Sequence, residues 1–106
     1  MDIDRRKVSA ELGISEDVYN ELIGEFIIQG EESASGMREA LGSGNLDEIA
    51  RIAHAVKGTS GNLRIRAVQE LALSIESAAK KKGADNIADD LAKLEEALAE
   101  LKGGKA

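Results

Sequence analysis

Apolar residues recur at steps of three and four along most of the chain. The clearest run is Ile87, Leu91, Leu94, Leu98 and Leu101. This spacing places side chains on one face of an α-helix, where they can be buried together. Proline is absent, and no run of alternating β-branched residues lies between turn signals, as a strand would require. The sequence therefore predicts an all-α fold.

The first two helices are marked by their termini. A short helix is expected from about Asp4 to Leu12, with Gly13 just beyond its end. Ser15 is the expected N-cap of a longer second helix, because its hydroxyl can accept a hydrogen bond from a free amide of the first turn. Glycines at 30 and 36 are expected to weaken the middle of this helix. Its apolar stripe consists of Tyr19, Leu22, Ile23, Phe26, Ile27, Met37 and Leu41.

A turn at 42–44 separates the second helix from a third, in which Asn45 is the expected N-cap. Glu48 follows three residues later and completes the pattern of a reciprocal capping box. The last turn of the fourth helix is expected to contain the lysines at 80–82, with Gly83 just after its end. The apolar stripe of this helix consists of Ile65, Val68, Leu71, Ala72, Ile75 and Ala79.

Asp85 or Asn86 is expected to open the fifth helix, and the tail at 103–106 is expected to fray. Four long amphipathic helices joined by short turns pack most simply as an antiparallel up-down-up-down four-helix bundle, with the short N-terminal helix lying across one end. The leucines of the fifth helix would also suit a coiled-coil dimer, but their stripe spans barely two heptads. We therefore expect a monomer with a single domain over residues 1–106.

The composition argues against several classes of function. The net charge is −6 and the only aromatic residues are Tyr19 and Phe26, so the chain lacks the clustered cations and stacking platforms that bind nucleic acid. Cysteine is absent and His54 is the single histidine, which excludes thiolate chemistry and a histidine-cluster metal site. No apolar segment has the length of a membrane span, and the N-terminus lacks the order of a signal peptide. We expect a cytoplasmic protein with no nucleic-acid or membrane partner.

His54 lies in the third helix, on a face made mostly of small residues. On a helical wheel Ile52, Val56 and Leu63 lie roughly 160–200° away from His54, on the face expected to enter the core. The imidazole is therefore expected to point into solvent. Ala50, Lys57, Gly58 and Gly61 share its face, because residues three, four and seven positions apart stack on one side of a helix. This arrangement indicates an imidazole that another macromolecule can approach closely, with an ammonium group beside it.

A purely structural explanation is also available. A single surface histidine is usually only solvated, and Gly58 would be an ordinary residue at the C-terminal end of a helix. The apolar spacing, however, continues past Gly58 to Leu63. Glycine inside a helix is less favourable than alanine by about 1 kcal/mol, and such departures from a local rule are typical of functional positions. We therefore interpret the His54 face as a functional surface.

The residues around His54 resemble those of a histidine-containing phosphotransfer (Hpt) domain, the small helical phosphocarrier of bacterial and plant-type phosphorelays. His54, Lys57 and Gly58 match the family's His-x-x-Lys-Gly motif, and Gly61 and Leu63 match the small and apolar positions that follow it.

The resemblance extends over most of the chain. Residues 18–23 with Phe26 are similar to the family's second helix, and residues 75–79 with Gly83 are similar to its fourth. One position departs from the pattern, because this chain has Arg64 where family members often have glycine. The turn into the fourth helix is where this difference is expected to matter.

The resemblance implies that His54 accepts a phosphoryl group from the aspartyl phosphate of a receiver domain and passes it to another receiver. It implies that Lys57 stabilises the phosphoryl oxygens and that Gly58 permits close approach. The partners would be receiver domains of response regulators or of a hybrid sensor histidine kinase. The receiver would supply Mg²⁺, while this chain would bind no cofactor and would have no catalytic activity of its own. A neutral imidazole has a free lone pair at cellular pH, so its role as a nucleophile is chemically consistent.

The docking surface is expected to include Ala50, Gly61 and Asn62, together with exposed apolar side chains of the second and third helices. Ser60 is expected to be a small packing residue. Two other functions are compatible with the sequence. A helical adaptor with an incidental His54 would bind partners without phosphoryl transfer. A hydrolase using His54 as general base is less consistent, because we expect no carboxylate on its face apart from Asp47, and a convex wall offers no enclosed pocket.

Overall fold

The computed structural model describes residues 3–83 and 86–104, which contain five helices and no strand. The helices are α1 (Arg5–Leu12), α2 (Glu16–Gly42), α3 (Leu46–Asn62), α4 (Arg66–Lys80) and α5 (Ile87–Lys102). Their order and number confirm the expectation of an all-α chain. Asp85, one of the two candidates for the start of the fifth helix, and residues 105–106 of the tail lie outside the described residues.

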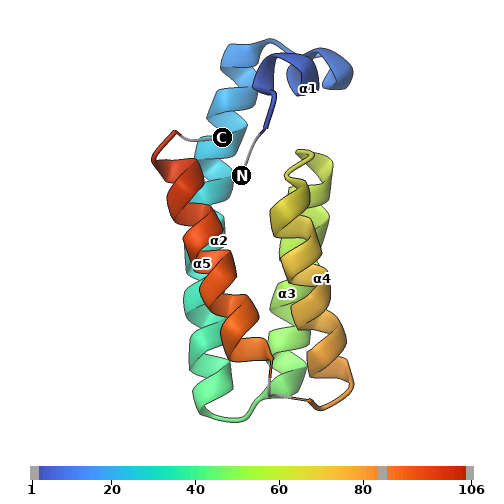
Figure 1. Cartoon of the computed structure of the whole chain (residues 1–106), viewed down its shortest axis with the longest axis vertical. Helices are drawn as coiled ribbons and strands as arrows, with labels where there is room; N and C mark the ends of the chain where they lie inside the picture. Colours follow the sequence, from blue (N-terminus) through green and yellow to red (C-terminus); the bar gives the residue numbers. More distant parts are fainter. Residues whose placement is uncertain (1–2, 84–85, 105–106) are drawn as a thin grey trace.

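The four long helices run alternately up and down and form an elongated bundle of 42 × 22 × 18 Å (Figure 1). Each packs against two neighbours, so that α2, α3, α4 and α5 form a closed ring, while α1 lies across one end and packs against α2. This confirms the antiparallel up-down-up-down four-helix bundle with a short extra N-terminal helix. Within the described residues no helix combines the length and the apolar character needed to cross a membrane.

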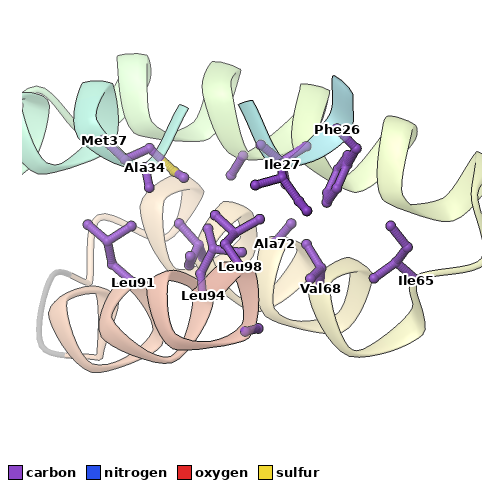
Figure 2. Close-up of a cluster of buried hydrophobic side chains, with 14 of the residues drawn as sticks. Phe26, Ile27, Ala34, Met37, Ile65, Val68, Ala72, Leu91, Leu94 and Leu98 are labelled. Carbon is purple, nitrogen blue, oxygen red and sulfur yellow. The ribbon is translucent and has the colours of Figure 1, made fainter. Parts of the chain in front are cut away.

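The core runs along the axis of the bundle and receives apolar side chains from all four long helices (Figure 2). The predicted stripe of α5 is buried along its whole length and faces the other helices. Its leucines therefore form an intramolecular seam. Labelled members of the core in Figure 2 are Phe26, Ile27, Ala34, Met37, Ile65, Val68, Ala72, Leu91, Leu94 and Leu98.

The buried face of α3 is rotated slightly from the one predicted. Ile52 and Leu63 were expected in the core, but both are only partly buried. The small Ala53 faces the core instead, because α3 packs closely against both α2 and α4. The buried residues of α3 are Ile49, Ala53, Val56 and Ser60. This rotation turns one flank of the His54 face toward α4.

α2 is continuous through both of its glycines, which allow neighbouring side chains to approach the helix. A Cβ at Gly30 would lie 2.8 Å from Cδ2 of Leu98 on α5, and one at Gly36 would lie 3.2 Å from Cδ1 of Ile52 on α3. The loss of helix propensity at these positions is therefore compensated by close packing of α2 against its neighbours.

Ser15 and Asn45 are the N-caps of α2 and α3, as predicted, and Asp4, the expected start of the first helix, is the N-cap of α1. The side chains of Asp4, Ser15 and Asn45 accept hydrogen bonds from backbone amides in the first turns of α1, α2 and α3. The reciprocal half of the capping box at α3 is absent. The Asn45 amide donates to the carbonyl of Ala40, 2.8 Å away, and the Glu48 carboxylate pairs with Arg51 instead.

The helices end on residues with left-handed backbone conformations. Gly13, Gly44 and Gly104 have φ between 73° and 74°, as expected for glycine after a helix. The predicted end of α4 was wrong. The helix ends at Lys80, so Lys82 lies beyond its last turn. Lys82, with φ of 59°, adopts the left-handed conformation that was expected of Gly83.

Arg64 also has a left-handed backbone conformation, with φ of 61°. Its amide donates to the carbonyl of Gly61, and the amide of Ile65 donates to that of Ser60, so the chain reverses between α3 and α4 with both hydrogen bonds made. The position at which this chain departs from the Hpt pattern is thus one that favours glycine sterically. The turn forms with arginine, at the expense of some backbone strain.

Candidate functional site

His54 lies in the middle of α3 on the outer wall of the bundle. Its side chain is 68% exposed, which confirms the predicted orientation. Ala53, the preceding residue, is buried, so the position of the imidazole follows directly from the packing of α3. A partner can therefore reach the imidazole without any rearrangement of the core.

A buried carboxylate lies beneath the imidazole, and the sequence analysis missed it. Glu76 of α4 has a side chain only 4% exposed, and its Oε2 lies 2.8 Å from Nδ1 of His54. Its Oε1 accepts a hydrogen bond from Nζ of Lys57 at 2.7 Å, and Nζ of Lys80 lies 3.2 Å from Oε2. The expectation that Asp47 would be the nearest carboxylate was wrong. Asp47 is exposed and pairs with Lys82 instead.

These contacts fix the charge of Glu76. The hydrogen bond from Lys57, assisted by those from Lys80 and His54, lowers the pKa of Glu76 from 4.5 to about 2, although burial acts in the opposite direction. The carboxylate is therefore ionised at neutral pH and can only accept hydrogen bonds. It follows that Nδ1 of His54 carries the proton that is donated to Glu76. In the neutral ring, the free lone pair is then on Nε2, on the opposite side of the imidazole.

The two flanks of the His54 face differ. Gly58 is exposed, and apart from its own stretch of helix backbone nothing lies within 4 Å of the place where a Cβ would stand. Gly61 does not provide the open surface expected of it, because a Cβ there would lie 2.7 Å from Nε2 of Gln69 on α4. Gly61 permits α4 to pack closely, while Gly58 leaves open space beside His54.

The remaining predicted residues occupy positions of three kinds. Asn62, the last residue of α3, is exposed, whereas Ala50 is partly buried against the core. Ser60 is fully buried, and its hydroxyl donates to the carbonyls of Val56, at 2.6 Å, and Lys57, at 3.2 Å. Ser60 is a packing residue, as expected.

A shallow groove between α2 and α3 lies on the side of the His54 helix away from Glu76. Ala55, the residue after His54, lines this groove together with Arg51 and Ile52 of α3. Ile28 is the most exposed large apolar residue of α2, at 61%. Ile28 does not line this groove, and Ile52, which does, is only partly exposed.

One signal in the sequence pointed to Glu76. Gln69 and Glu76 are seven residues apart and lie on the same face of α4. Ala72, between them, belongs to the apolar stripe and is buried. Two polar residues at the margin of a buried stripe indicate a polar contact with the neighbouring helix, and here Gln69 contacts the α3 surface at Gly61 while Glu76 binds His54.

The described residues contain no group of three or more histidine, aspartate or glutamate side chains that could hold a metal ion. The charges around His54 come instead from one carboxylate and two ammonium groups. This set can orient an imidazole and interact with an anion beside it.

Comparison with known proteins identifies the family. No curated protein and no solved structure shows significant similarity to the chain. The sequence model of the Hpt domain, however, matches residues 21–104, which include His54, Lys57 and Glu76. The match covers most of the chain and all four helices of the bundle except the first five residues of α2. The chain therefore belongs to the Hpt domain family, whose members carry out histidine phosphotransfer in phosphorelay signalling.

Proposed function

We propose that this chain is a phosphocarrier that uses Nε2 of His54. The Nε2 lone pair attacks the phosphorus of an aspartyl phosphate on a receiver domain, an N–P bond forms, and the P–O bond to the aspartyl carboxylate breaks. The carboxylate leaves with the electron pair. The same steps in reverse pass the phosphoryl group to the aspartate of another receiver. The observation that supports this most directly is the bond between Nδ1 of His54 and the ionised, buried Glu76.

Glu76 serves the chemistry in two ways. It holds the ring in one tautomer, so that the nucleophilic nitrogen is always Nε2. It also offsets the positive charge that the ring acquires as the N–P bond forms, because Nδ1 keeps its proton and its hydrogen bond to the carboxylate. Glu76 is a positioning residue, since it acts through His54 and does not touch the phosphoryl group.

The rest of the mechanism belongs to the partner. Phosphoryl transfer depends mainly on alignment and on stabilisation of the phosphoryl charge. The open space beside Gly58 permits the rim of a receiver active site to approach the imidazole. The receiver, from a response regulator or a hybrid sensor kinase, would supply Mg²⁺, and this chain alone would turn over no substrate. In this proposal the chain acts as a monomer with one domain over residues 1–106.

The test uses two phosphoryl donors. Receiver domains charged with acetyl phosphate in the presence of Mg²⁺, and separately the small donor phosphoramidate, are incubated with the wild-type chain and with His54→Gln. We expect an acid-labile mass increment of one phosphoryl group on the wild-type chain and none on the variant. A wild-type chain that stays unlabelled with both donors, or a label that persists in His54→Gln, would overturn the proposal. The first of these results is the one that an adaptor predicts.

A further inference from the structure

The two lysines that contact Glu76 are held differently. Lys57 has a side chain 29% exposed, and its Nζ lies 2.7 Å from Oε1 of Glu76. Lys80 has a side chain 65% exposed, and its Nζ lies 3.2 Å from Oε2. Lys57 is also the main cause of the lowered pKa of Glu76. The shorter and better-buried contact therefore belongs to Lys57, and the looser one to Lys80.

Lys80 and His54 share one oxygen of the carboxylate. Oε2 lies 2.8 Å from Nδ1 of His54 and 3.2 Å from Nζ of Lys80, so the two nitrogens are at most about 6 Å apart. Lys80 is the last residue of α4, and its long, flexible side chain can change conformation without moving either helix. Its ammonium group is thus next to the imidazole and free to turn toward solvent.

We propose that Lys80, and not Lys57, is the cation that binds the phosphoryl group once it is on His54. This inference rests on the proposed function and assigns a phosphoryl-binding residue to it. When Nε2 is phosphorylated, Nζ of Lys80 leaves Oε2 and donates to the phosphoryl oxygens, while Oε2 keeps the proton of Nδ1. Lys57 stays on Oε1. No covalent bond of either lysine changes in this exchange.

The two oxygens of Glu76 explain why the exchange uses Lys80. Oε1 has Lys57 as its donor, so withdrawal of Lys57 would leave a buried anionic oxygen without a partner, which is strongly unfavourable. Oε2 has two donors and can lose Lys80 while the bond to His54 remains. The role that the family resemblance gives to Lys57 is therefore performed here by its neighbour across the α3–α4 seam.

The experiment measures the formation and decay of phosphohistidine without a receiver. The wild-type chain and the variants Lys80→Ala, Lys80→Arg, Lys57→Ala and Lys81→Ala are incubated with phosphoramidate, and the phosphorylated fraction is followed by mass spectrometry during labelling and after the donor is removed. Lys81 is the matched control, because it is exposed and directly follows Lys80. ¹⁵N NMR of the imidazole reports its tautomer, and thermal unfolding reports stability.

We expect Lys80→Ala to slow labelling of His54 by about tenfold, the size of one near-surface charge contact. The tautomer signal should be unchanged, and Tm should fall by less than in Lys57→Ala, because the Lys80 contact is longer and more exposed. Lys80→Arg should restore most of the rate, and Lys81→Ala should match the wild type. Lys57→Ala should lower Tm and alter the tautomer signal. The inference is overturned if Lys80→Ala labels like Lys81→Ala, or if Lys57→Ala slows labelling with an unchanged tautomer signal. A wild-type chain that is not labelled at all would instead overturn the proposed function.

Discussion

Two seams of the bundle carry ion pairs of different construction. At the α2–α5 seam, Arg38 donates two hydrogen bonds to Glu95, and the two side chains are 45% and 40% exposed. At the α3–α4 seam, Glu76 is almost fully buried beneath His54 and is bound by three cationic or potentially cationic groups. The first pair lies in water on the surface of the bundle, whereas the second forms part of its interior.

This difference separates stability from function. An exposed ion pair contributes about 0–1 kcal/mol, because water screens it. A buried carboxylate is favourable only when every partner is present, and an apolar residue of similar volume is often equally good for stability. The α3–α4 seam thus contains a group that packing alone does not require. The three partners converge on its carboxylate, and one of them is the exposed His54, which indicates that Glu76 is present to act on the imidazole.

Removal of one carboxylate charge at each seam should reveal the largest difference between the two seams. Glu76→Gln should reduce the free energy of unfolding at pH 7 by on the order of 2 kcal/mol, a value discounted because the partner groups are partly solvated. It should also slow phosphoryl transfer to His54 by about tenfold or more. Glu95→Gln should change stability by less than about 1 kcal/mol and leave transfer unaffected. Denaturant unfolding and labelling rates measure both effects. Equal destabilisation by the two variants would contradict the distinction between the seams.

Acid should remove the stability that the ionised Glu76 contributes at the α3–α4 seam. The folded pKa of Glu76 is about 2, below its ordinary value of 4.5, so the stability that it contributes is complete above pH 4.5 and is lost as the pH falls toward 2. The difference in unfolding free energy between the wild type and Glu76→Gln should therefore be constant from pH 7 to about 5 and shrink steadily below that. A difference that stays constant down to pH 3 would mean that Glu76 is not held ionised by its partners.

Substitution of an exposed glycine should separate access to His54 from stability of the fold. Gly58 and Gly24 are both exposed inside helices, with no atom near the place of a Cβ. Alanine at either position should raise the free energy of unfolding by up to about 1 kcal/mol. Only Gly58→Ala should slow transfer from a receiver, by several-fold, because only Gly58 lies beside His54. Transfer rates that are equal for the two variants would remove Gly58 from the docking surface.

Much of the fold follows from local sequence. The three- and four-residue apolar spacing predicted the four long helices, and Asp4, Ser15 and Asn45 marked three helix starts, because caps and helical stripes depend on residues close together in the chain. The helix ends at Arg64 and Lys82 were harder to predict, since a left-handed residue after a helix is usually glycine and a charged residue there gives no warning.

The candidate site around His54 was predicted only in part. The exposure of His54 and the open space at Gly58 are properties of a single helix, so the periodicity of α3 was sufficient to find them. Glu76 and the contact of Gly61 with Gln69 depend on the register between α3 and α4, over 22 residues of sequence in the case of His54 and Glu76. Spacing within either helix does not determine that register, so the sequence places Glu76 at the margin of the α4 stripe but does not identify His54 as its partner.

Tyr19 links the start of the bundle to the turn that follows the site helix. Its hydroxyl donates to the carbonyl of Leu63 at 2.5 Å, from a residue 44 positions away in sequence, and burial raises the pKa of Tyr19 above its usual 10.0 despite the nearby Arg5 and Arg64. The chain has one tyrosine and no tryptophan. Its near-ultraviolet absorption and emission therefore come chiefly from this one phenol, which gives the domain an intrinsic optical reporter on the α3–α4 turn. Alkaline titration of that phenol should detect any opening of the turn without an added label.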